Sequence, residues 1–128
     1  MPYITWEYYN SLYNDVTDEK EFNQLLMKAE TKLNTITHMR AKEFVSSFHE
    51  ETATNFQKQV AEQVKQTVCE LINAIYQQET HGMGTGIVSV SNDGYSESYK
   101  ITTAAEKETQ IYGIVRADLS GTGLVGAL

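Results

Sequence analysis

The sequence predicts a mainly α-helical protein: a small helical bundle with one long helix, a β-hairpin and a flexible C-terminal arm. Three observations lead to this fold class. Apolar residues recur every three or four positions through most of residues 4–79, which is the period of an amphipathic helix. The period then changes to two around a tight-turn sequence. Finally, the chain finishes on glycines that alternate with apolar residues.

Composition limits the classes of protein that fit. A chain of 128 residues suits a single domain that buries a modest core. Seventeen acidic and ten basic side chains give a formal net charge of -7, which opposes non-specific attraction to nucleic-acid phosphates and anionic lipids. The single cysteine, Cys69, excludes an intrachain disulfide and indicates a buried thiol. No apolar run is long enough for a membrane span, and the start lacks a signal-peptide pattern, so we expect a cytosolic protein.

Two helices are expected in the early part of the chain. The stretch 4–13 places aromatic and apolar residues at helical spacing after Thr5, which suits an N-cap. Turn-forming residues 13–17 interrupt this pattern, and Asp18 with Glu21 three positions later forms a capping box that begins a second helix. The apolar stripe of that helix consists of Phe22, Leu25, Leu26, Ala29, Leu33 and Ile36.

The stretch from Glu50 to about Glu79 carries the clearest helical signal of the chain. A break near residues 35–37 separates it from the helix before it, and three apolar residues in between are expected to continue a core face: Met39, Phe44 and Phe48. The long helix has its own stripe, formed by Phe56, Val60, Val64, Val68, Leu71, Ile72 and Ile75. Three glycines at alternate positions in the stretch 81–86 end this helix, because glycine is unfavourable in a helix interior.

A β-hairpin is expected over residues 87–101. Two stretches with alternating character, 87–91 and 95–101, flank the tight-turn sequence Asn92-Asp93-Gly94. Because a lone two-stranded hairpin is marginally stable in water, it must lie on the helices or join strands from a neighbouring subunit. The residues expected to make these hairpin or inter-subunit contacts are Ile87, Val88, Val90, Tyr95 and Tyr99.

The chain is expected to end with a short helix followed by a glycine-rich strip. Thr103 and Glu106 form a capping box, and the helix has an apolar side made of Ile111, Ile114, Val115 and Leu119. The strip D-L-S-G-T-G-L-V-G-A-L cannot form a helix or core by itself, so it is either a frayed end or a segment built to lie on another surface. We therefore divide the chain into a helical domain, 1–117, and a C-terminal arm, 118–128.

No catalytic or metal-binding pattern stands out in the sequence. The glycine-rich stretches 82–86 and 121–123 lack the lysine and hydroxyl of a nucleotide loop. The three histidines are dispersed without metal-ligand spacing, and no carboxylate pair is singled out for catalysis. Cys69 has only Lys65 one helical turn away, which is a weak basis for a nucleophile. We expect no cofactor, metal or catalytic residue, and an enzyme built from scattered carboxylates and tyrosines is the minority hypothesis.

Two stretches resemble the head–tail connector proteins of long-tailed bacteriophages, also called adaptor or head-completion proteins. The family begins with a short aromatic helix that precedes a helix with an Ala-rich, Thr-terminated end. This chain is similar at its start, where I-T-W-E-Y-Y is followed by E-F-N-Q-L-L-M-K-A-E-T-K-L-N-T-I-T at 21–37. The close D-L-S-G-T-G-L-V-G is similar to the family's Leu-Ser-Gly-Thr-Gly-Leu signature. The elements between them also follow the family's order. The last residues, 125–128, depart from the aromatic and basic residues common in the family.

The resemblance implies a structural protein of a phage or prophage. Its subunits would form a ring, commonly a dodecamer, that docks under the portal at the head–tail junction of the virion and receives the next connector or tail-completion protein. Assembly would take place in the bacterial cytoplasm from a subunit that is monomeric when free. DNA would pass through the lumen without specific binding, which the acidic charge suits. The arm would contact the portal through Leu119, Thr122, Leu124 and Val125.

A function from another class remains open at this point. The chain also fits a small helical partner-binding or regulatory protein of a prophage, which would use the apolar stripe of the long helix as a groove or dimer face. A connector would bind portal and form rings. A regulator would form a small oligomer of fixed size without affinity for a portal.

Overall fold

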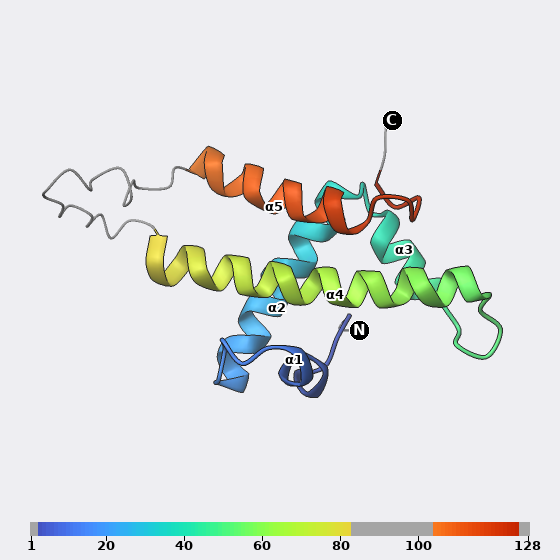
Figure 1. Ribbon diagram of the computed structural model, residues 1–128, viewed down its shortest axis with the longest axis horizontal. Helices are drawn as coiled ribbons and strands as arrows, with labels where there is room; N and C mark the ends of the chain where they lie inside the picture. Colours follow the sequence, from blue (N-terminus) through green and yellow to red (C-terminus); the bar gives the residue numbers. More distant parts are fainter. Residues whose placement is uncertain (1–2, 83–103, 126–128) are drawn as a thin grey trace, which may run out of the picture.

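The computed structural model describes residues 3–82 and 104–125, and this part of the chain is mainly helical. Its elements are α1 (Trp6–Leu12), α2 (Glu19–Ile36), α3 (Arg40–Ser47), α4 (Asn55–Gln77), the π-helical turn η1 (Gln78–Gly82) and α5 (Ala104–Asp118). Figure 1 shows α4 and α5 side by side in opposite directions, with α2 crossing α4. The prediction of a helical bundle with one long helix is confirmed. None of the described helices is long and apolar enough to cross a membrane.

Side-chain caps begin the first two helices where the sequence predicts them. The Thr5 hydroxyl accepts a hydrogen bond from the Tyr8 backbone N–H at 3.0 Å, at the start of α1. The Asp18 carboxylate accepts one from the Glu21 N–H, also at 3.0 Å, at the start of α2. Each cap satisfies an N–H group that has no partner within its own helix. Both predicted helix starts are therefore confirmed.

The long helix α4 begins later than its periodicity predicted. It starts at Asn55 instead of Glu50, because Thr54 and Gln57 form a reciprocal capping box at that point. Phe56, which was assigned to the buried stripe, is 57% exposed. It lies in the first turn of α4, whereas the core contacts of this helix begin one turn later, at Val60.

The predicted break after residue 35 is confirmed as a sharp corner between α2 and α3. Thr37 is buried there, and its hydroxyl donates to the Leu33 carbonyl at 2.9 Å and accepts from the Ala41 N–H at 3.2 Å. His38 and Met39 both have positive φ angles, +55° and +67°, in a region that residues other than glycine seldom adopt. Met39 was expected on a core face but is 45% exposed, because it belongs to this corner and not to a helix face.

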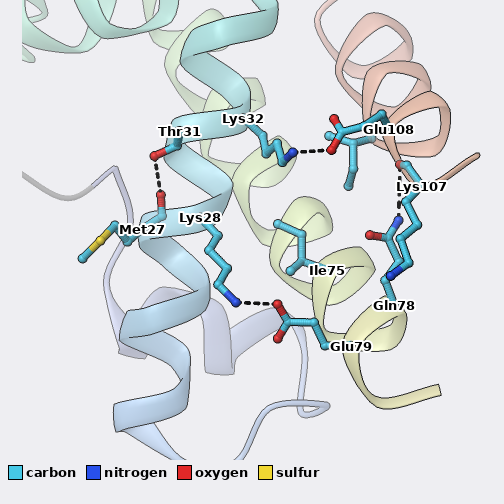
Figure 2. Close-up of a pocket in the computed structure, with 10 residues that line it drawn as sticks. Met27, Lys28, Thr31, Lys32, Ile75, Gln78, Glu79, Lys107 and Glu108 are labelled. Carbon is cyan, nitrogen blue, oxygen red and sulfur yellow. Dashed lines mark hydrogen bonds and ion pairs between the residues drawn. The ribbon is translucent and has the colours of Figure 1, made fainter. Parts of the chain in front are cut away.

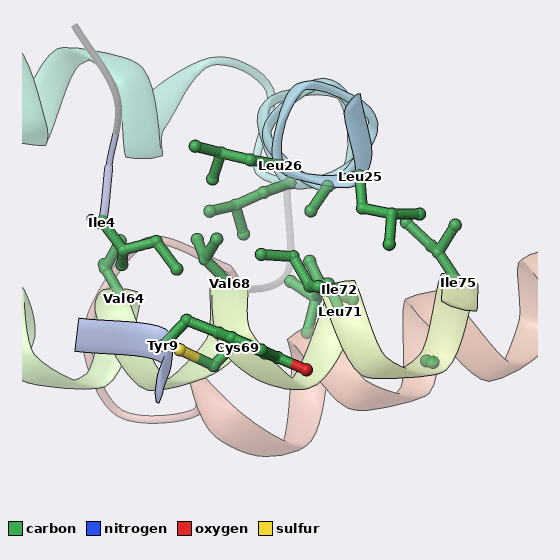
Figure 3. Close-up of a cluster of buried hydrophobic side chains, with 14 of the residues drawn as sticks. Ile4, Tyr9, Leu25, Leu26, Val64, Val68, Cys69, Leu71, Ile72 and Ile75 are labelled. Atoms are coloured by element: carbon green, nitrogen blue, oxygen red, sulfur yellow. The ribbon is translucent and has the colours of Figure 1, made fainter. Parts of the chain in front are cut away.

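Most of the core lies between α2 and α4. Their predicted apolar stripes face each other and exclude water, which is the main favourable contribution to folding. Figure 3 shows the two α2 side chains Leu25 and Leu26 directed at α4, whose facing residues include Val64, Val68, Ile72 and Ile75. Ile36, at the end of the α2 stripe, is only partly buried.

The aromatic opening of the chain is tied to α4 by hydrogen bonds. Tyr9 is fully buried, and its hydroxyl donates to the Asn73 side chain of α4 and accepts from the Val16 N–H at 3.1 Å. The Tyr8 hydroxyl donates to the Glu62 carboxylate at 2.6 Å. These contacts hold α1 and the α1–α2 connection against the middle of α4.

The hairpin predicted over residues 87–101 lies outside the described residues, and the parts before and after it contain no strand. Its five contact residues lie outside them as well, so their role stays a prediction. The chain leaves the described part at η1 and re-enters it at α5. Both points are at one end of the α4–α5 pair (Figure 1).

Candidate functional site

The predicted portal contacts come together in one element, the C-terminal segment, which we define as residues 119–125. This segment folds back on the helices: Leu119 is 0%, Leu124 7% and Thr122 8% exposed, and Val125 packs against the core in a partly buried position. The expectation of a free arm is thereby corrected for these residues. The apolar side of α5 runs directly into the segment, so its two leucines gain a burial that a solvated strip lacks.

Thr122 closes the C-terminal segment on itself. Its hydroxyl donates to the Leu119 carbonyl at 2.7 Å and accepts from the Leu124 N–H at 3.1 Å. The Thr122 backbone N–H donates to the same Leu119 carbonyl at 3.1 Å. A hydroxyl is the group that can donate and accept at once, so one side chain links both ends of the turn.

Two glycines make this turn possible. Gly121 and Gly123 have φ of +85° and +87°, values that glycine adopts without a steric penalty. A Cβ at either position would meet no atom within 4 Å, so backbone conformation and not space requires glycine. The motif L-S-G-T-G-L therefore specifies a closed turn with an apolar anchor at each end.

A pair of carboxyl groups lies where α5 joins the C-terminal segment. Asp118 ends α5, and its side chain lies within hydrogen-bonding reach of Glu70 on α4. Burial raises the pKa of Glu70 to about 7, and hydrogen bonding to Asp118 and the charge of Asp118 add to this shift. The Gln63 side-chain amide donates to the Asp118 backbone carbonyl at 3.1 Å and holds the same junction on α4. Sequence reasoning missed this pair because its members are distant in the chain.

A pocket of about 390 Å³ opens where α2, the end of α4 and α5 meet (Figure 2). The buried side chains Ile75 and Ile111 form part of its lining, and the exposed Met27 stands at α2. Two exposed ion pairs connect its walls: Lys28 with Glu79, and Lys32 with Glu108. Both lysines lie outside the apolar stripe of α2, and helix periodicity alone does not reveal their partners. Exposed pairs of this kind add little stability.

The described part of the chain contains no metal-binding cluster, and its single cysteine is buried. Within residues 3–82 and 104–125, no three His, Cys, Asp or Glu side chains are placed to hold a metal ion. Cys69 is fully buried, and burial, followed by the charges of Glu62 and Glu70, raises its pKa to about 12. Because the thiolate is the nucleophilic form, Cys69 is inert at neutral pH. The prediction of a buried thiol is confirmed.

The structure thus brings Leu119, Thr122, Leu124 and Val125 into one turn on the core, beside an acidic pair that the sequence did not indicate. Comparisons with profiles of protein families, with curated proteins and with solved structures give no match for this chain.

Proposed function

We propose that this protein is a structural subunit of a bacteriophage head–tail connector, which assembles as a ring between the portal and the next protein of the tail. The observation that carries the proposal is the closed turn formed by L-S-G-T-G-L. Five of the six positions of the motif meet a separate physical requirement: two apolar anchors, two positive φ angles and one bridging hydroxyl. The likeness to the connector signature therefore rests on residues with defined structural roles and not on a glycine-rich composition.

Portal binding involves the C-terminal segment in this proposal. Leu119 and Leu124 are buried in the free chain, so they contact a portal only after the segment leaves its place on the core. The subunit stores the segment on its own helices until a portal surface replaces them. The positive-φ glycines then allow the two backbones to approach closely.

Ring formation involves the other end of the molecule. The end of η1 and the start of α5 lie at one end of the α4–α5 pair (Figure 1). In this proposal residues 83–103 contact the next subunit in a heterologous manner, and such contacts form a ring when the rotation between subunits closes. The subunit carries no enzymatic activity in this role, and DNA passes the acidic ring without specific binding.

The regulatory alternative is less well supported. It assigns partner binding to the apolar stripe of the long helix, but from Val60 to Ile75 that stripe is buried within this chain. A partner would have to displace α2 or α5 to reach it. No observation in the described part of the chain favours such an exchange over the connector role.

A pull-down against the portal protein encoded beside this gene tests the proposal. The full chain is compared with a version that ends at Asp118 and with Thr122→Val, which keeps the shape of the side chain but loses the bridging hydroxyl. We expect the full chain to bind portal and to form rings in negative-stain images, the truncated chain not to bind, and Thr122→Val to bind more weakly. Circular dichroism checks whether each variant remains helical.

Two outcomes decide against the proposal. If the full chain neither binds portal nor forms rings, the connector role is wrong, and a small oligomer of fixed size would favour the regulator. If the truncated chain remains folded and binds as well as the full chain, the ring survives but the C-terminal segment has no part in docking. Should the truncated chain unfold, Thr122→Val alone decides the role of the segment.

A further inference from the structure

The junction between α5 and the C-terminal segment has an unusual electrostatic arrangement. Asp118 is the last residue of α5, where the helix dipole places partial negative charge and disfavours a carboxylate. Glu70 of α4 brings a second carboxyl group against it. Two negative charges within hydrogen-bonding reach repel each other, and the repulsion is stronger in a half-buried site than in water.

No cation relieves this repulsion in the described part of the chain. The other titratable groups coupled to the pair are Tyr13, from the α1–α2 connection, and Cys69, from α4, and neither of them is positively charged. The Oδ2 atom of Asp118 is buried and accepts no hydrogen bond from any described residue. A proton on Glu70 supplies the missing donor, because the protonated carboxyl donates an O–H to the Asp118 carboxylate.

We propose that Glu70 and Asp118 form a proton-dependent latch: a shared proton holds the end of α5 and the C-terminal segment on α4, and its loss loosens the segment. The latch needs no binding partner. The loosened segment would then expose Leu119 and Leu124 to a portal, and only this last step rests on the proposed function.

The direction of the pH dependence follows from the two states of Glu70. In the latched state its pKa is raised to about 7, whereas a carboxyl freed from this site returns towards its ordinary 4.5. Between these values the latched state holds a proton that the released state lacks, so rising pH favours release. Above about pH 7 both states are deprotonated and the effect levels off. The apolar anchors and the hydrogen bond from Gln63 do not titrate, so the segment is loosened and not expelled.

Hydrogen exchange of backbone amides tests the latch on the full-length protein. The probes are the amides of Leu119, Thr122 and Leu124, which all donate within α5 or the turn. Protection factors remove the intrinsic pH dependence of exchange. We expect those of the three probes to fall about tenfold between about pH 5.5 and about pH 7.5 and to stay level above that. The amides of Leu71 and Ile72 in α4 should remain protected, which separates local release from global unfolding.

Two variants and a control identify the proton. In Glu70→Gln the amide donates to Asp118 at every pH, so protection should become independent of pH. Asp118→Asn supplies a donor from the other side and should have the same effect, which preserves the test if the first variant fails to fold. Glu51→Gln changes an exposed carboxyl outside this site and should retain the wild-type fall.

A flat pH profile in the wild-type protein overturns the latch, as does a fall in Glu70→Gln equal to that of the wild type. Neither result depends on a portal. A flat profile leaves the connector role intact, and a failed portal pull-down leaves the latch intact, so the two proposals fail separately.

Discussion

The long helix α4 is held by its two neighbours in different ways. Its contact with α2 is an interlocking of aliphatic side chains, with both stripes buried. Its contact with α5 and the C-terminal segment has a smaller apolar part, consisting of Ile111, Val115, Leu119 and Leu124. Polar contacts surround that part: the amide of Gln63 on Asp118, the amide of Gln78 on Gln110 at 2.7 Å, and the carboxyl pair.

The difference shows which part of the molecule is able to respond to its surroundings. Apolar burial does not depend on the protonation of side chains, and kosmotropic salts such as sulfate strengthen it. Hydrogen bonds to charged groups and close carboxyl pairs change with protonation. The α2–α4 side is therefore the permanent part of the fold, and the α5 side is the part whose attachment the proposed latch would alter.

The largest expected effect comes from the buried face of α4. Leu71→Ala removes a fully buried side chain of α4, and the cavity it leaves should lower the free energy of unfolding by about 3 kcal/mol. Urea denaturation followed by circular dichroism measures this loss. Met27→Ala, at a side chain that is 68% exposed, is the control and should change stability by less than about 0.5 kcal/mol.

The matching change on the α5 side should cost less. Leu124→Ala removes an anchor of the C-terminal segment, and we expect the free energy of unfolding to fall by about 1–2 kcal/mol, because the segment can detach locally and so limits the loss. Hydrogen exchange should show the amides of the segment opening while those of α4 stay protected. A loss equal to that of Leu71→Ala, with α4 opening as well, would mean that the two sides form one cooperative unit.

A smaller effect tests the turn itself. Thr122→Val removes the hydroxyl that links Leu119 and Leu124, and the amide protection of the segment should fall by the equivalent of about 1 kcal/mol. Thr122→Ser keeps the hydroxyl and should retain most of the protection. If the two variants behave alike, the bridging hydrogen bonds do not hold the turn.

The smallest effect is expected at the surface of the pocket. Lys32→Ala breaks the ion pair with Glu108 between α2 and α5, and because both side chains are exposed the loss should be about 0.5 kcal/mol or less. Salt at about 1 M should remove the difference from wild type. Lys20→Ala, at an exposed position in the first turn of α2, is the matched control. A loss above about 1 kcal/mol that survives high salt would place this pair among the main supports of α5.

Periodicity and capping residues were sufficient to predict α1, α2, α5 and most of α4, because both signals are local, whereas α3 was not predicted as a separate helix. Thr5 and Asp18 begin helices where their side chains reach an N–H three residues on, and the stripes of α2 and α4 are buried as expected except at Ile36 and Phe56. Phe56 shows the limit of this reasoning: it has the correct spacing, but no neighbouring element covers the first turn of α4. Periodicity predicts which face of a helix is apolar. It does not predict how many turns of that face neighbouring elements cover.

The candidate site was less accessible to sequence reasoning. The fold of the C-terminal segment had one local signal that was not used: Leu119 belongs both to the apolar side of the last helix and to the strip after it, so the strip begins inside the core. The pairing of Glu70 with Asp118 had no local signal, because it depends on the register between α4 and α5. Helix periodicity does not determine such a register.

The closed turn around Thr122 has a consequence for the thermodynamics of binding. A peptide that is disordered when free loses conformational entropy on the surface of its partner, and its affinity is reduced accordingly. The hydrogen bonds of Thr122 join only residues of the C-terminal segment. In the proposed release from the core, the segment therefore retains these bonds. The segment would therefore bind a partner as a preformed turn, and such preorganisation reduces the loss of conformational entropy on binding.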